Sequence, residues 1–209
     1  MGERTAIHLV RHGEVHNPGK VLYGRLPGFR LSDAGVQMAG AATRALVGRD
    51  VTLLVSSPLE RARQTAEPLA AAFGLDVVVD DRLIESANLF EGRVVEGVRS
   101  FMSFDVLRHL GNPHRPSWGE PYAEIAERVR GAVDDARKTA AGHEAVLVSH
   151  QLPIWVFRRA VEGRPLWHRP DRRQCALASI TTVHYDDDQL VRVEYSEPAG
   201  AGVSGPPGA

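Results

Sequence analysis

The chain has very little cysteine, no long apolar run and almost no net charge. Its single cysteine, Cys175, excludes an intramolecular disulfide and any zinc site built from several cysteines. No apolar stretch reaches the roughly 18–20 residues that cross a bilayer, and the first residues lack a basic segment followed by an apolar one. A net charge of -1 gives no general attraction to nucleic acid or to an anionic membrane. We therefore expect a cytoplasmic protein whose partner is neither nucleic acid nor membrane.

The histidines also lack a spacing typical of a metal site, such as His-Glu-x-x-His on a helix, so we expect no metal and no other cofactor. What is present is the composition of a soluble globular protein, with 43% hydrophobic and 24% charged residues in 209. This length suits one domain, which we place at residues 1–197. Residues 198–209 are rich in Gly, Pro and Ala and are expected to form a disordered tail.

Apolar runs and amphipathic segments alternate along the chain. The runs predict strands at 6–10, 51–57, 75–80 and 144–150, and the segments predict helices at 33–47, 59–73, 122–141 and 152–161. This alternation is typical of an α/β fold with helices on both faces of the sheet, a three-layer α/β/α sandwich. A terminal hairpin over 179–185 and 190–196 adds an antiparallel edge to a mostly parallel sheet. Residues 85–121 are the hardest to interpret, with a helix expected near 94–110.

Charged and polar side chains follow the predicted strands at the points where they end. Ligands of such sheets bind beyond the carboxyl ends of the strands. The stretch "LVRHGEVHNP" places Arg11 and His12 there, and "SSPLERARQTA" places Arg61 in the first turn of a helix. His150 follows the fourth strand, and Glu85 follows the third.

Two histidines and an arginine pair near a helix N-terminus favour an anion site, and a phosphoryl group is the natural occupant. Neutral imidazole attacks phosphorus, so His12 could serve as the nucleophile. The neighbouring arginines favour the neutral form of His12 and would stabilise charge on the phosphoryl oxygens. A carboxylic acid such as Glu85 could protonate the leaving oxygen and then take a proton from water.

The motifs "LVRHGE", "SSPLERARQTA", "LIE" and "VLVSHQ", in this order, resemble those of the histidine phosphatase superfamily. This group contains the cofactor-dependent phosphoglycerate mutases and their phosphatase relatives. The resemblance implies a phosphoglycerate mutase-like fold and His12 as the phosphorylated nucleophile. It implies Glu85 as the proton donor and a phosphate pocket made of Arg11, Arg61 and His150.

Substrate contacts are also implied by the resemblance. They come from Asn17, Tyr23 and Gly24 on the long loop after His12. We also expect a substrate contact from Gln151, although it stands where family members often carry glycine. Two further carboxylates, Glu91 and Glu96, compete with Glu85 for the role of the acid.

We therefore predict a metal-independent phosphomonoester hydrolase that acts on a small phosphorylated metabolite through a phosphohistidine. The first alternative is phosphoryl transfer of the phosphoglycerate mutase type, although "LIESANLFEG" matches the mutase pattern poorly. The second is a phosphate-binding module without catalysis. A homodimer is left open.

Some polar residues are interpreted as ordinary surface. Arg63 is expected to point to solvent from a different face of its helix than Arg61. The arginine-rich stretches "VFRR" and "HRPDRRQ" are interpreted as exposed faces, with recognition of an acidic substrate as the alternative.

Overall fold

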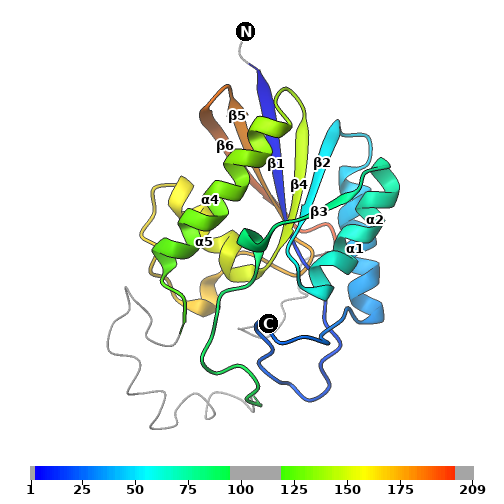
Figure 1. Ribbon diagram of the computed structural model, residues 1–209, viewed down its shortest axis with the longest axis vertical. Helices are drawn as coiled ribbons and strands as arrows, with labels where there is room; N and C mark the ends of the chain where they lie inside the picture. The colour runs from blue at the N-terminus through cyan, green and yellow to red at the C-terminus, as the bar shows by residue number, and fades with distance from the viewer. Residues whose placement is uncertain (1–2, 95–118, 201–209) are drawn as a thin grey trace.

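A computed structural model describes residues 3–94 and 119–200 of the chain. Its centre is a six-stranded sheet in the order β3-β2-β4-β1-β5-β6 (Figure 1). The strands are β1 (Arg4–Arg11), β2 (Val51–Ser56), β3 (Val77–Val79), β4 (Glu144–Ser149), β5 (Ile180–Asp186) and β6 (Gln189–Ser196). The helices are α1 (Asp33–Leu46), α2 (Glu60–Phe73), α4 (Tyr122–Thr139) and α5 (Gln151–Val161). Two short 3-10 helices, η1 (Asp81–Leu83) and η3 (Pro170–Arg172), complete the elements of residues 3–94 and 119–200.

Strands β1 to β4 pair with one another in parallel, whereas β5 and β6 form antiparallel pairs. β1 and β2 both pair in parallel with β4, and β3 pairs in parallel with β2. β5 pairs antiparallel with β1, and β6 with β5. The predicted mostly parallel sheet with an antiparallel edge is confirmed.

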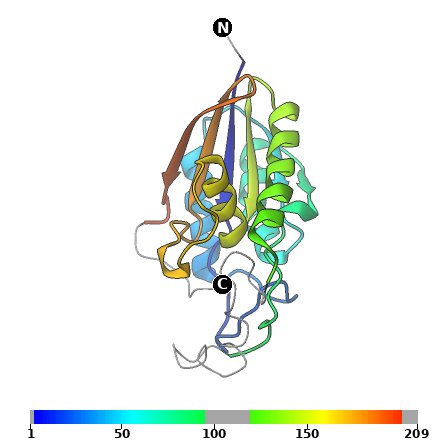
Figure 2. The same cartoon turned by 90° about the vertical axis from the view of Figure 1, so that its left-hand side faces the viewer.

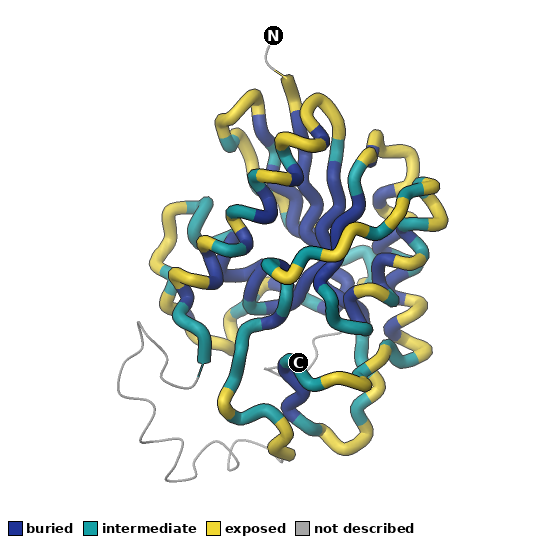
Figure 3. The backbone as a smooth tube through the Cα atoms, viewed as in Figure 1, coloured by how far each residue is buried: buried dark blue, intermediate teal, exposed yellow. Residues whose placement is uncertain are grey.

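The sheet is covered on both faces because the central strands are apolar on both sides. Ile7 and Leu9 pack with α4 and α5 in one hydrophobic cluster, and Val10 packs with α1 and α2 in another. The two helix pairs therefore lie on opposite faces, as Figures 1 and 2 show. The residues of the central strands form long buried runs in the described part of the chain (Figure 3). This is the predicted three-layer α/β/α sandwich.

Two irregular segments meet beyond the carboxyl ends of the parallel strands. The long loop after β1 and the segment after η1 lie together there (Figures 1 and 2). An isolated backbone bridge from Val21 to Val94 joins the two segments. A second bridge, from Asn88 to Gly119, joins the segment after η1 to the residues just before α4. The loop expected to be functional is thus held against the chain rather than extended into solvent.

The third strand is shorter than the predicted 75–80, because β3 is an edge strand whose Val78 and Val79 are exposed. The helix predicted near 94–110 and most of the predicted tail lie outside the described residues, so the division of the chain at residue 197 stays a prediction. No helix in the described part of the chain is both long and apolar enough to cross a membrane.

Candidate active site

His12 follows the last residue of β1 and is fully buried. Its backbone N–H donates to Ser149 O at 3.1 Å, which extends the pairing of β1 with β4 by one residue. Its Nδ1 lies 2.8 Å from Gly13 O. Because a carbonyl only accepts, Nδ1 carries the proton and Nε2 of the neutral ring keeps its lone pair. The backbone therefore selects Nε2 as the nucleophilic nitrogen.

Gly13 is required by close packing of backbone against backbone. A Cβ at this position would lie 2.4 Å from Gly35 O in the first turn of α1. The Gly13 N–H also donates to Thr65 Oγ1 on α2 at 3.1 Å. The glycine of the Arg-His-Gly motif thus lets the start of α1 approach the turn that carries His12.

Arg61 reaches the imidazole from the first turn of α2 and is 1% exposed. Its Nε–H donates to His12 Nε2 at 3.3 Å, and its Nη2 donates to Gly24 O at 2.7 Å. The guanidinium also lies 4.8 Å from the centre of the Tyr23 ring. No carboxylate forms an ion pair with Arg61 among the described residues, so its charge is available to an anion.

Arg11 and His150 complete the group at the carboxyl ends of β1 and β4, and both are fully buried. Arg11 Nη1 donates to Cys175 O at 2.7 Å. The ring of His150 lies 5.1 Å from that of His12, and its Nε2 is 2.7 Å from Ser57 Oγ. Within the part of the chain that the structure describes, His150 Nδ1 has no hydrogen-bond partner. This nitrogen can therefore bond an oxygen of a ligand.

Both histidines are neutral near neutral pH. Burial lowers the pKa of His12 well below 6.5, and the charges of Arg61 and Arg11 lower it further, against the smaller effect of the Gly13 carbonyl. Burial and then Arg61 likewise lower the pKa of His150. A neutral His12 has the free lone pair that nucleophilic attack needs.

Glu85 is 9% exposed and lies close enough to Arg61 for its charge to act on that guanidinium. Its Oε1 accepts from the Ser86 backbone N–H at 2.8 Å. Its charge opposes the lowering of the pKa of Arg61 that burial causes. The rival Glu91 is bound inside the loop, since its Oε1 accepts from the backbone N–H of Arg25 at 3.0 Å and of Asn88 at 3.3 Å. Glu96 lies outside the described residues.

The residues expected to contact substrate hold the surrounding loop in place. The side chain of Asn17 forms two hydrogen bonds with the backbone of Val21. Its Nδ2 donates to Val21 O at 2.8 Å, and its Oδ1 accepts from the Val21 N–H at 3.0 Å. Tyr23 is 2% exposed, stacks on Phe29 and supports Arg61, while burial raises its pKa to about 12. Gly24 has a positive φ of 39° and offers its carbonyl to Arg61. Their substrate contacts stay predictions.

Gln151 begins α5 directly after His150. Its Nε2 donates to Cys175 O at 3.4 Å, the carbonyl that Arg11 also bonds. Its Oε1 accepts from Arg173 Nη1 at 3.3 Å. The side chain therefore lies beside the pocket, and its own contact with substrate stays a prediction.

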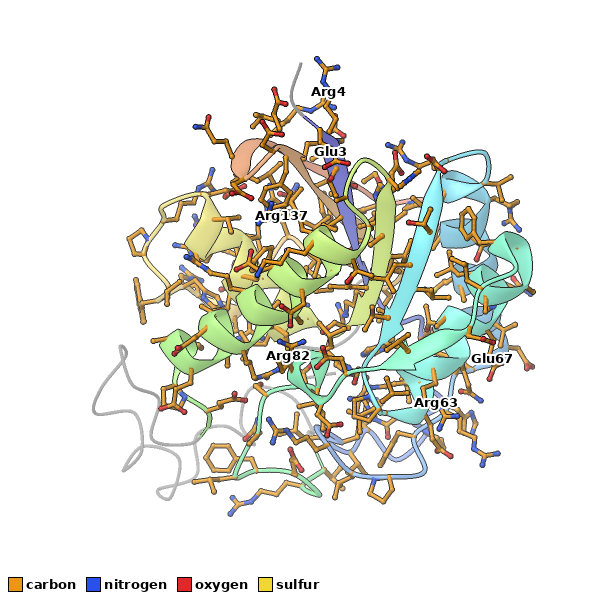
Figure 4. The ribbon with its side chains drawn as sticks, turned by 45° about the horizontal axis from the view of Figure 1, so that its top comes forward. Glu3, Arg4, Arg63, Glu67, Arg82 and Arg137 are labelled. Carbon is orange, nitrogen blue, oxygen red and sulfur yellow. The ribbon has the colours of Figure 1, made fainter. Side chains whose placement is uncertain are left out.

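Sequence reasoning missed three supporting residues. The Ser57 hydroxyl orients His150, and the Thr65 hydroxyl accepts from the Gly13 N–H. Their position within "SSPLERARQTA" was the only signal for them in the sequence. Arg173 is half-buried and His168 is buried, so the interpretation of "HRPDRRQ" as an exposed face is correct for Arg172 and wrong for these two. The same interpretation of "VFRR" is wrong, since both of its arginines are half-buried. Arg63, by contrast, is exposed on α2 as expected (Figure 4).

A family of known proteins resembles the chain over most of its length. The sequence profile of the histidine phosphatase superfamily (branch 1) matches residues 7–198. The chain belongs to the histidine phosphatase superfamily. The described residues hold no group of three or more His, Cys, Asp and Glu side chains that could bind a metal ion.

Several superfamily relatives resemble the chain over nearly its whole length. The uncharacterized protein Rv0525 of Mycobacterium tuberculosis is 55% identical over 95% of this chain and 99% of its own. Phosphoserine phosphatase 1 of Hydrogenobacter thermophilus is 31% identical over 88% of each chain, and the probable phosphoglycerate mutase GpmB of Escherichia coli is 30% identical over 83% of each. The solved mycobacterial glucosyl-3-phosphoglycerate phosphatase Rv2419c, in complex with VO3, is 27% identical with a TM-score of 0.73, over 91% of this chain and 96% of that one. The superfamily thus includes both phosphatases and mutase-type relatives of this chain.

Proposed function

We propose that the chain is a metal-independent phosphomonoester hydrolase that acts on a small phosphorylated metabolite through a phosphohistidine. The observation that carries the proposal is the state of His12. Its Nδ1 proton is held by Gly13 O, and its neutral Nε2 points its lone pair at Arg61 Nε. A nucleophilic nitrogen with a cation 3.3 Å away is arranged to meet a phosphoryl group.

The phosphoryl group would bind between the two arginines and the two histidines. Arg61 would turn its donors from His12 and Gly24 to the phosphoryl oxygens, and His150 Nδ1 would meet another oxygen. Positive charge from Arg11 and Arg61 would stabilise the charge that spreads over these oxygens in the transition state. Arginine is suited to this work because its planar fork donates two parallel hydrogen bonds.

In the first step, His12 Nε2 forms a bond to phosphorus while the ester P–O bond breaks. Glu85, as the carboxylic acid, gives its proton to the departing oxygen, and the alcohol leaves. The product is phosphohistidine with Glu85 as carboxylate. The Nδ1–H bond to Gly13 O stabilises the positive charge that the ring acquires.

In the second step, water attacks phosphorus in line with the P–N bond. The Glu85 carboxylate takes a proton from this water, the P–N bond breaks, and inorganic phosphate departs. His12 returns to its neutral form and Glu85 to its acid form. The cycle therefore runs on these side chains and water.

The test is phosphate release from a panel of phosphomonoesters with a chelator present, for the wild type, His12→Ala and His143→Ala. His143 is an exposed histidine at the opposite end of the sheet, paired with Asp50, and is the matched control. We expect release to fall at least about a thousandfold in His12→Ala and to stay unchanged in His143→Ala.

The panel includes 3-phosphoglycerate with its bisphosphate primer, and 2-phosphoglycerate is monitored. Its appearance without net phosphate release would replace the hydrolase with the mutase. Release that survives in His12→Ala, or that needs added metal, would refute the proposal. Phosphate binding without any turnover would support the alternative of a phosphate-binding module without catalysis.

A further inference from the structure

Arg173 lies in the connection between α5 and β5, beside the pocket but outside the group that would hold the phosphoryl. Its neighbours Arg169 and Arg172 are exposed, whereas Arg173 is half-buried. Burying an arginine is unfavourable unless its charge meets a partner. The contacts of Arg173 therefore need an explanation.

One side of the guanidinium is fixed by His168. Nδ1 of His168 lies 2.7 Å from Leu166 O, so it carries the proton and leaves Nε2 as the acceptor. Arg173 Nε donates to this Nε2 at 2.9 Å. Burial lowers the pKa of His168 to about 4, and the ring packs against Tyr122. Arg173 is thus held by a neutral histidine that adds no charge.

The other side of the guanidinium is linked to the phosphate pocket. Arg173 Nη1 donates to Gln151 Oε1 at 3.3 Å. Gln151 Nε2 and Arg11 Nη1 donate to the same carbonyl, Cys175 O, at 3.4 and 2.7 Å. Gln151 and this carbonyl therefore lie between Arg173 and Arg11 in one series of hydrogen bonds.

The charge of Arg173 is not neutralised within the described residues. It forms no ion pair there, and its Nη2 has no acceptor. Two other half-buried arginines differ, since Arg128 pairs with Glu120 and Arg158 with Glu162. Burial lowers the pKa of Arg173, and the charges of Tyr122 and Glu85 oppose this effect.

We propose that Arg173 binds a carboxylate that the substrate carries in addition to its reacting phosphoryl group. The inference deepens the proposed function and rests on it. The free Nη2 and the second Nη1 hydrogen form a planar fork, which matches the two oxygens of a carboxylate. A second phosphate is less suited to the position, because a single cation stands here whereas two arginines and two histidines surround the first site.

The test compares two esters that share the phosphoryl end and differ at the other. 3-Phosphoglycerate carries a carboxylate where glycerol 3-phosphate carries a hydroxymethyl group. Calorimetry on His12→Ala measures their binding without turnover. The variants are His12→Ala alone and combined with Arg173→Gln, with Arg173→Lys or, as the matched control, with Arg172→Gln, whose side chain is exposed.

We expect His12→Ala to bind 3-phosphoglycerate about tenfold to a hundredfold more tightly than glycerol 3-phosphate. Arg173→Gln should remove most of this preference, Arg173→Lys should restore part of it, and Arg172→Gln should leave it intact. Equal affinities for the two esters, binding of neither, or an equal loss for both in Arg173→Gln would overturn the inference. The comparison of the two esters on His12→Ala alone needs no Arg173 variant, so it tests the inference even if those variants do not fold.

The role of Arg173 and the proposed hydrolase function can fail independently of each other. If the protein prefers the ester with the carboxylate but the wild type releases no phosphate, the role of Arg173 is supported and the proposed hydrolase function is refuted. Phosphate release that depends on His12, without any preference between the esters, would do the reverse.

Discussion

Arg61 Nε donates to His12 Nε2 at 3.3 Å, which places a buried cation on the nitrogen that would attack phosphorus. The contact has two consequences. It helps to keep the imidazole neutral, and it marks where a phosphoryl group must enter, because the incoming phosphorus displaces this hydrogen bond. When substrate binds, Arg61 is therefore expected to exchange its hydrogen bond to His12 for hydrogen bonds to the phosphoryl oxygens.

Replacing Arg61 should impair the transition state far more than the fold. Arg61→Lys keeps a charge but loses the fork that bonds both His12 and Gly24. We expect kcat/KM for phosphate release to fall about a hundredfold to a thousandfold, the usual effect of removing one stabilising donor. The matched control is Arg63→Lys, on the exposed side of α2, which should change little. Similar losses in both variants would contradict this role.

Glu85→Gln should separate the two steps of the proposed reaction. An alkyl ester needs the acid, whereas p-nitrophenolate leaves without a proton, so the variant should lose much more rate on glycerol 3-phosphate than in the release of the first p-nitrophenol. Hydrolysis of the phosphohistidine also needs the carboxylate as a base. Rapid-mixing measurements should therefore show a burst of p-nitrophenol followed by slow turnover.

Glu91→Gln tests the competing assignment of the acid. Glu91 binds two backbone N–H groups within the loop, so its variant should lower stability and affect both esters alike. If the burst and the dependence on the leaving group appear in Glu91→Gln instead of Glu85→Gln, the acid has been assigned to the wrong carboxylate.

The buried histidines should make the free energy of unfolding depend on pH. Folded His12 and His150 have a pKa below 6.5, so the unfolded chain binds more protons as the pH falls. Stability is then fully present above about pH 6.5 and declines below it, by up to about 1.4 kcal/mol per pH unit for each histidine. Denaturant unfolding between about pH 8 and pH 5 measures this slope. The double variant His12→Asn/His150→Asn should reduce this slope and leave the part that His168 contributes, since burial lowers the pKa of His168 to about 4. An unaltered slope would show that other groups cause the pH dependence.

Gly13→Ala should damage both stability and activity, because the new Cβ would lie 2.4 Å from Gly35 O and neither backbone can retreat easily. We expect a loss of more than about 2 kcal/mol of unfolding free energy together with reduced phosphate release. Gly19→Ala in the same loop is the control, since its Cβ would meet only Val21 Cγ2 at 3.5 Å. Thermal unfolding and the phosphatase assay check both, and equal behaviour of the two variants would contradict the packing argument.

The strand exits could be predicted from the sequence, because a strand buried on both faces is a continuous apolar run that ends visibly, as at Val10 before Arg11. His12, Arg61 and His150 could be placed together for the same reason. The tautomer of His12 could not, since it depends on the direction of a single carbonyl. The burial of Arg173 could not either, because the ring that holds it, His168, is itself covered by Trp155 and Tyr122 from separate helices.

The most direct measurement is the covalent intermediate itself. Glu85→Gln is mixed briefly with p-nitrophenyl phosphate and quenched in alkali, where a phosphorylated histidine survives, and the digested chain is analysed by mass spectrometry. The account predicts one phosphoryl group on the peptide that contains His12, and none when His12→Ala is added. Phosphate release by the wild type with no phosphorylated His12 in either protein, or with the group on another residue, would contradict it.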